Sequence, residues 1–300
     1  MVKYFTLLEI REFLKNNYLD LFNKYENLTL LYPLKIKENL YELKGNIDFK
    51  LEKKKSNLIV NKNIEYNDII IPISDGNTFI PLSNETSLNN IKVGDRIRNK
   101  VTSYKSGSVG FVFQIRDTES FFLVTNQHVI GRNYKDNDII QKIISKKDHP
   151  TKYRNIGTYY DGVVSSYLDL AIVELTEEFN PTENDEVFIT QNIIDCQRIF
   201  INNITQNIVS TYAYVKTSKK NSDFYDPPII LKEQIITNYK MFRGDSGSLA
   251  INSSNEAIGL LFAKNTKFSV LNNINNVIKY ICHKLNIKKE NIKIINQFNT

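Results

Sequence analysis

The chain carries the run Gly244-Asp245-Ser246-Gly247-Ser248, directly before an apolar stretch at 249–251 that has the composition of a β-strand. Glycine tolerates backbone φ values that other residues avoid, so two glycines around one serine permit a sharp turn that exposes its hydroxyl. Backbone N–H groups in such a turn can point at a developing oxyanion. Clusters of Gly, Asp and Ser also form ordinary turns. The run therefore indicates a nucleophilic serine only if the chain supplies a base for it.

Histidine is the usual base for a serine, and the chain contains three of them, His128, His149 and His283. His128 lies in the stretch 121–130, an apolar strand that ends in a short polar break, so we expect its imidazole at a strand end. A histidine there can also simply cap the strand. His149 lies in a polar loop, and His283 lies in an apparent helix beside Cys282, where one Cys–His pair is far short of a metal site. His128 is the candidate base.

An imidazole base needs a carboxylate that selects its tautomer and stabilises its protonated form. Asp169 stands near the start of the apolar stretch 168–175, where a lone buried carboxylate would be costly. A protonated imidazole would offset that cost, although an aspartate that caps a strand in water needs no such partner. Asp161 is the nearest alternative, but the glycine after it marks a turn. Asp169 is the candidate acid.

The order histidine, aspartate, serine is that of the chymotrypsin class, and it differs from the order in subtilisins and α/β-hydrolases. The segments 125–129, 169–173 and 244–248 resemble the segments around the histidine, aspartate and serine of that class. Over residues 108–281, the chain resembles a trypsin-like serine protease of the chymotrypsin fold.

Within that family, the chain is similar to bacterial trypsin-like peptidases related to the plant NARROW LEAF proteins. Those relatives carry a small N-terminal module and a Gly-Leu-Leu-Phe-Ala strand after the serine. In this chain the strand is at 259–263.

The resemblance implies a role for each residue of the site. His128 would be the general base, Asp169 the acid that orients it, and Ser246 the nucleophile. The backbone N–H groups of Gly244 and Ser246 would form the oxyanion hole. The implied activity is endopeptidase hydrolysis of a protein or peptide substrate through an acyl-enzyme, with no cofactor and no metal.

The position six residues before the serine differs from that of trypsin-type enzymes that cut after basic residues. Those enzymes carry an acid there, whereas this chain has Lys240. We expect Lys240, Phe262 and Lys264 to line the pocket for the residue before the cut, and Lys240 favours an acidic or neutral residue. Secreted relatives pair the aspartate of the serine loop with a freed N-terminus. This chain has no visible pro-segment, which leaves the partner of Asp245 open.

Composition restricts the class of protein. No apolar run approaches the roughly 20 residues of a membrane span, and charges within the first twelve residues argue against a secretory signal. Cys196 and Cys282 are few cysteines for a secreted protease, which favours the cytoplasm. The net charge is +6, but the basic residues are interleaved with Asn and Glu. The densest cluster of lysines, at 50–55, is interpreted as the solvated end of a strand. We therefore expect neither a nucleic-acid partner nor a membrane.

The first part of the chain, residues 1–92, predicts a small α+β module of unknown role. Apolar residues recur at helical spacing over 3–24, alternate as in a half-buried strand over 43–51, and form a second strand at 68–73. The polar stretch 83–90 has the composition of a linker.

The second part, residues 93–300, predicts the protease domain and makes the fold class mainly β. Short strands and turns are typical of an all-β sandwich or barrel. The resemblance implies two barrels, at about 93–180 and 181–270, which would divide at the acidic loop 177–185. An amphipathic helix follows at about 272–286. The cleft between two such barrels is a preferred place for a substrate.

Two other functions remain possible from the sequence. Because fold does not determine function, the chain could be a catalytically silent binding or scaffold protein with a protease fold. The positive charge could also serve a nucleic-acid binder, although the chain contains no aromatic-basic motif that would support one.

Overall fold

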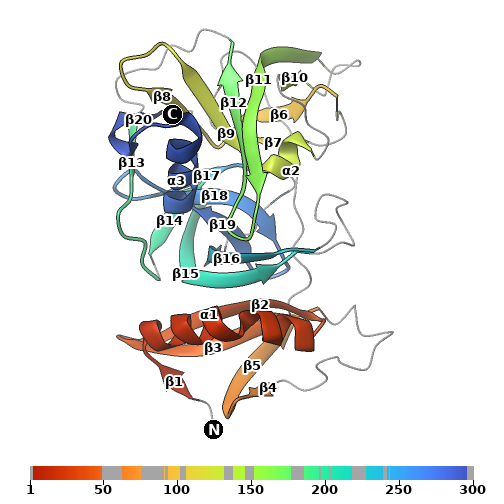
Figure 1. Ribbon diagram of the computed structural model, residues 1–300, viewed down its shortest axis with the longest axis vertical. Helices are drawn as coiled ribbons and strands as arrows, with labels where there is room; N and C mark the ends of the chain where they lie inside the picture. The colour runs from red at the N-terminus through yellow and green to blue at the C-terminus, as the bar shows by residue number, and fades with distance from the viewer. Residues whose placement is uncertain are drawn as a thin grey trace.

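The computed structural model describes residues 3–48, 63–75, 91, 94–101, 106–131, 138–145, 152–176, 186–195, 197–202, 204–217, 228–238, 242 and 244–295. Strands dominate these residues, and the N-terminal elements gather at one end of the molecule (Figure 1). The predicted class is confirmed, because the fold is mainly β with an α+β module before it and a helix near the C-terminus. The predicted linker 83–90 and the predicted division at 177–185 lie outside the described residues.

Antiparallel strands between residues 96 and 175 close into a ring. Residues 107–115 close the ring. Strand β7 (Gly107–Ser108) pairs with β6 (Arg96–Asn99), and β8 (Phe111–Ile115) pairs with β9 (Phe121–Thr125). The remaining pairings run from β6 through β10, β11 and β12 to β9. The strands are β6 (Arg96–Asn99), β7 (Gly107–Ser108), β8 (Phe111–Ile115), β9 (Phe121–Thr125), β10 (Ile139–Ser145), β11 (Lys152–Val164) and β12 (Asp169–Leu175).

The position of β12 between two hydrophobic clusters explains the apolar run at 170–173. Ala171 and Val173 pack into one buried cluster with Ile97 and Leu123. Their neighbours Leu170 and Ile172 face a different cluster, which also contains the C-terminal helix. A strand that is buried on both faces shows a run of apolar residues instead of an alternation.

A second ring follows in the chain. Its pairings run from β14 through β15, β16, β19, β18 and β17 back to β14. Isoleucine and leucine side chains such as Ile199, Ile235 and Leu261 fill its interior and are fully buried. The strands are β14 (Arg198–Ile201), β15 (Ile204–Lys216), β16 (Ile230–Thr237), β17 (Leu249–Asn252), β18 (Glu256–Lys264) and β19 (Ser269–Asn273).

The C-terminal segment joins the two rings. Helix α3 (Ile274–Leu285) agrees with the predicted helix, and the Asn273 side chain caps its first turn. After a short 3₁₀ turn, η5 (Lys289–Asn291), strand β20 (Ile292–Ile295) pairs with β8 of the first ring. Strand β20 also pairs with β13 (Glu186–Ile189), which lies parallel to β18 of the second ring. No pattern in the sequence predicted β20.

The N-terminal module begins with a capped helix. The predicted helix 3–24 starts later, at Leu7, because Thr6 forms a capping box with Glu9. The Glu9 N–H donates to Thr6 Oγ1 at 3.3 Å, and the Thr6 N–H donates to Glu9 Oε2 at 2.7 Å. The predicted strand at 43–51 runs from 40 to 47 instead. The elements are β1 (Tyr4–Phe5), α1 (Leu7–Lys24), β2 (Leu28–Lys37), β3 (Leu40–Ile47), β4 (Asn63–Tyr66) and β5 (Ile69–Asp75).

The module and the second ring share one sheet and one core. Strand β2, which the sequence analysis did not predict, pairs with β15 through Leu31 opposite Tyr214. The rings of Tyr18 in α1 and Tyr214 lie 4.7 Å apart between centroids, and Tyr214 is buried in the module's hydrophobic cluster. Burial raises the pKa of the Tyr214 hydroxyl far above its ordinary value, so this phenol stays neutral.

We expect the two faces of α1 to respond differently to truncation of leucine. Leu14 is fully buried, whereas Leu8 is 68% exposed. Leu14→Ala should lower the free energy of unfolding by about 2–5 kcal/mol, because it leaves a cavity in the core. Leu8→Ala, the matched control, should change it by less than about 0.5 kcal/mol. Urea denaturation measures both, and equal losses would contradict this packing of the helix.

Candidate active site

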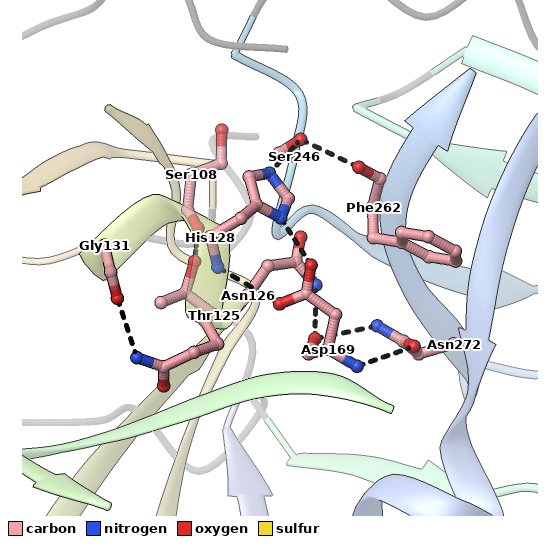
Figure 2. A network of polar contacts seen from close by, with 10 residues as sticks. Ser108, Thr125, Asn126, His128, Gly131, Asp169, Ser246, Phe262 and Asn272 are labelled. Carbon is pink, nitrogen blue, oxygen red and sulfur yellow. Dashed lines mark hydrogen bonds and ion pairs between the residues drawn. The ribbon is translucent and has the colours of Figure 1, made fainter. Parts of the chain in front are cut away.

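His128 lies just after β9, on one short turn of helix. The sequence predicts a strand that ends in a short polar break, and β9 does end at Thr125. The short helix α2 (Gln127–Ile130) that follows was not predicted. At the end of the strand, the Thr125 hydroxyl donates to the carbonyl of Ser108 at 2.8 Å. The turn of helix leaves His128 only 7% exposed and directs it toward β12 (Figure 2).

Asp169 binds His128 through both of its carboxylate oxygens. Asp169 Oδ2 lies 2.6 Å from His128 Nδ1, and Asp169 Oδ1 accepts the backbone N–H of His128 at 3.1 Å. Asp169 is fully buried, so these bonds offset the cost of removing its charge from water. A carboxylate opposite Nδ1 requires the proton on that nitrogen, which leaves Nε2 as an acceptor.

Ser246 completes the contact from the second ring. Its Oγ lies 3.0 Å from His128 Nε2 and 3.2 Å from the carbonyl oxygen of Phe262 (Figure 2). The structure thus brings together the three side chains that the sequence analysis selected, from segments far apart in the chain. Ser246 is fully buried.

The loop around Ser246 has the backbone that its glycines suggest. Gly244 has a φ of 103° and Gly247 a φ of 100°, values that disfavour any residue with a Cβ. Asp245 lies between them, and its carboxylate accepts the N–H of Phe242 at 2.8 Å and the side-chain amide of Asn202 at 3.3 Å. Asp245 therefore binds its own loop at Phe242 and a distant turn at Asn202.

Ser108 of the first ring holds the same loop. Its hydroxyl donates to the carbonyl of Gly244 at 2.5 Å, and its N–H donates to the carbonyl of Ser246 at 2.7 Å. The guanidinium of Arg96 also donates to the Gly244 carbonyl, at 3.4 Å. The loop that carries the predicted oxyanion-hole amides is thus attached to the ring that carries the base.

We expect substitution of Gly247 to damage this loop. A Cβ at Gly247 would overlap the carbonyl oxygen of Ser108 and would lie 2.6 Å from Thr125 Oγ1. Gly94 has a comparable φ of 84°, but its nearest neighbour, Asn202 Oδ1, is 3.7 Å away. Gly94→Ala should therefore cost only the backbone strain, roughly 1–2 kcal/mol. Gly247→Ala should cost more, on the order of 4 kcal/mol. Thermal unfolding compares the two, and equal losses would show that the loop tolerates the clash.

The three residues predicted to line the substrate pocket have different outcomes. Phe262 is fully buried, and its side chain packs in a cluster with Leu30 and Tyr32 of β2, so only its carbonyl faces the serine. Lys264 is partly exposed at the end of β18. Lys240 lies outside the described residues. Their role in specificity stays a prediction.

The alternative residues lie away from this contact. Asp161 forms an ion pair with Lys284 at 2.8 Å. His283 belongs to the last turn of α3, beside Cys282, where burial raises the pKa of the Cys282 thiol and disfavours its thiolate. His149 lies outside the described residues.

Two classes of feature are absent from the described part of the chain. Among those residues, no three His, Cys, Asp or Glu side chains are grouped to hold a metal ion. No helix among them is both long and apolar enough to cross a membrane.

Sequence reasoning missed the side chains that support the site. These are Ser108, Asn126 and Asn272, of which Asn126 and Asn272 donate to the backbone carbonyl of Asp169. The partners of Ser108 and Asn272 are distant in the chain, and no local motif marks these two residues. Asn126 lies within the segment 125–129, but that segment does not indicate its contact with Asp169.

Comparison with known proteins gives similar structures only. No protein-family model and no curated protein matches the chain. Nocardiopsis protease is 13% identical, with a TM-score of 0.46 over 69% of this chain and 100% of that one. A glutamic acid specific serine protease is 14% identical, with a TM-score of 0.46 over 68% of this chain and all of its own. Cellulomonas bogoriensis chymotrypsin is 14% identical, with a TM-score of 0.39 over 70% of this chain and 100% of its own. Because the identities and TM-scores are this low, the chemistry of the site is argued only from the distances between the chain's own side chains.

Proposed function

We propose that the chain is a serine endopeptidase that hydrolyses peptide bonds through an acyl-enzyme. The observation that carries the proposal is the continuous contact from Asp169 through His128 to Ser246, with distances of 2.6 Å and 3.0 Å. A base within hydrogen-bond reach of a hydroxyl, and itself oriented by a third group, is the arrangement that activates a serine.

The proposed reaction follows from these contacts. Ser246 Oγ attacks the carbonyl carbon of the substrate while His128 Nε2 takes its proton, and the Asp169 carboxylate stabilises the imidazolium. The N–H groups of Gly244 and Ser246 stabilise the oxyanion. The carbon–nitrogen bond then breaks, and His128 gives the proton to the leaving amine. A water molecule then attacks the acyl-enzyme ester while His128 takes its proton. His128 returns that proton to Ser246 Oγ, and the carboxylic acid product leaves.

The alternative, a catalytically silent protein with a protease fold, has one observation in its favour. Ser246 is fully buried, so a substrate has no direct path to its hydroxyl in this conformation. Against it, a binding protein gains nothing from a serine hydroxyl 3.0 Å from an imidazole that a buried carboxylate orients. The aligned contact therefore favours the enzyme.

Digestion of a peptide library, read by mass spectrometry, tests the proposal. The enzyme should create new termini, and Lys240 predicts acidic or neutral residues before the cut. Cleavage after Lys and Arg alone would refute the specificity while keeping the protease. A folded protein that cleaves no peptide would favour the silent alternative.

Three further parts of the proposal rest on the sequence. The low cysteine count supports a cytoplasmic location, and the change of pattern near residue 92 supports a boundary between the module and the protease domain. The strand at 259–263 supports the relation to NARROW LEAF-type peptidases.

A further inference from the structure

The backbone of Asp169 is bound by side chains where a neighbouring strand would otherwise pair with it. Strand β12 pairs with β9 only from Ala171 onward, so Asp169 extends beyond that pairing. Its N–H donates to Asn272 Oδ1 at 3.3 Å, and its carbonyl accepts Asn272 Nδ2 at 2.9 Å (Figure 2). Asn126 Nδ2 donates to the same carbonyl at 2.9 Å.

Asn272 is suited to this contact in a way that few residues are. A side-chain amide carries a donor and an acceptor at one end, so it can bind both the N–H and the C=O of one residue, as a strand does. Asn272 is fully buried, so each bond replaces water that the site excludes. Asn126, which is also buried, offers only its donor to Asp169.

The position of Asn272 matters because it lies in the other ring. Asn272 belongs to β19 of the second ring, which also carries Ser246, whereas Asp169 and His128 belong to the first ring. The backbone of Asp169 determines where its carboxylate lies, and that carboxylate contacts both the N–H and Nδ1 of His128. A displacement of this backbone would therefore change the direction of the imidazole toward Ser246.

We propose that Asn272 is a positioning residue that holds Asp169 in register with the ring that carries the nucleophile. The inference rests on the proposed function, because it assigns Asn272 a part in the same reaction. Asn272 acts only through Asp169 and binds no substrate. Its loss should therefore lower kcat and kcat/KM together and leave KM unchanged, which marks an interaction needed in the transition state. A misplacement of catalytic groups by about 1 Å costs on the order of 10²-fold in rate.

Two substitutions test the contact, one by removing only the donor of Asn272 and the other by removing its donor and its acceptor. Asn272→Asp keeps the shape and the acceptor but replaces the donor with a carboxylate oxygen that faces the Asp169 carbonyl. Asn272→Leu removes both groups at similar volume. We expect kcat to fall on the order of 10²-fold in each.

Asn252→Leu is the matched control. Asn252 is a buried asparagine of the same ring, and its Oδ1 accepts the N–H groups of Ser254 and Glu256 at 2.9 Å each, away from the three aligned residues. Asn252→Leu should lower the melting temperature but leave kcat unchanged. A comparable loss of kcat in Asn252→Leu would reduce the role of Asn272 to general stability.

A second measurement does not depend on turnover. The proton on His128 Nδ1 lies in a short bond to a buried carboxylate, and proton NMR detects such a proton as a far-downfield resonance. We expect this resonance in the wild type and in Asn252→Leu, and its shift or loss in folded Asn272→Asp and Asn272→Leu. An unchanged resonance and an unchanged kcat in folded Asn272→Asp would overturn the inference. If the wild type hydrolyses nothing but the resonance still responds to Asn272, the positioning role stands and the proposed protease activity fails.

Discussion

Ser246→Ala is expected to lower kcat by about 10⁶-fold, the loss measured when the nucleophile of a known serine protease is removed. The substitution deletes the oxygen that lies 3.0 Å from His128 Nε2 and leaves the base without a proton to take. Water would then have to attack the substrate carbonyl directly, without the help of a positioned serine oxygen. Steady-state hydrolysis of a peptide identified in the library digest measures the loss.

Ser248→Ala is the control for this prediction, because Ser248 lies in the same loop. Ser248 is also fully buried, and its hydroxyl has no hydrogen-bond partner among the described residues. A buried hydroxyl without a partner lowers stability, so its removal should leave kcat unchanged and keep or raise the melting temperature. Equal turnover in the two variants would show that Ser246 is not the nucleophile.

Asp169→Asn is expected to lower kcat by about 10⁴-fold. An amide can turn its NH₂ group toward His128 Nδ1, which forces the imidazole proton onto Nε2. That nitrogen then cannot accept the proton of Ser246. The same substrate and the same rate measurement apply.

Asp161→Asn is the matched control for the carboxylate. Asp161 is partly exposed and pairs with Lys284, so its loss removes an ion pair of little energetic value and no contact with His128. Its kcat should equal that of the wild type. Should Asp169→Asn match Asp161→Asn in rate, the carboxylate would have no part in catalysis.

The residues of the site were predictable where a local pattern carries them. The apolar run after Asp169 indicated a buried strand, and a carboxylate that is itself buried at the start of such a strand needs a partner. The two glycines around Ser246 indicated a backbone with positive φ, and both glycines have one. These signals depend on neighbours in the chain, so the sequence alone contains them.

The supporting contacts were not predictable, because they join distant segments. Asn272 and Asp169 are 103 residues apart, and Ser108 and Gly244 are 136 apart. An asparagine near the end of a strand has many roles, and only the pairing of strands selects one. Strand β20 was missed for the same reason, since its four residues become a strand through pairing with β8 and β13.

The environment of Phe262 gives a third example. Strand β2 of the N-terminal module pairs with β15 and brings Leu30 and Tyr32 into the cluster that buries the side chain of Phe262. Pairing between strands nearly two hundred residues apart leaves no local trace. The module therefore packs against the side chain of Phe262 in β18, and the carbonyl of Phe262 contacts Ser246.

Reaction with a fluorophosphonate, followed by peptide mapping of the adduct, tests the central claim most directly. A serine activated by a base displaces fluoride from the probe, whereas an ordinary serine hydroxyl does not. We predict one adduct on the wild type, located on Ser246, and no adduct on Ser246→Ala. A folded wild-type protein that stays unlabelled, or that carries the adduct on another residue, would contradict the assignment of Ser246 as an activated nucleophile.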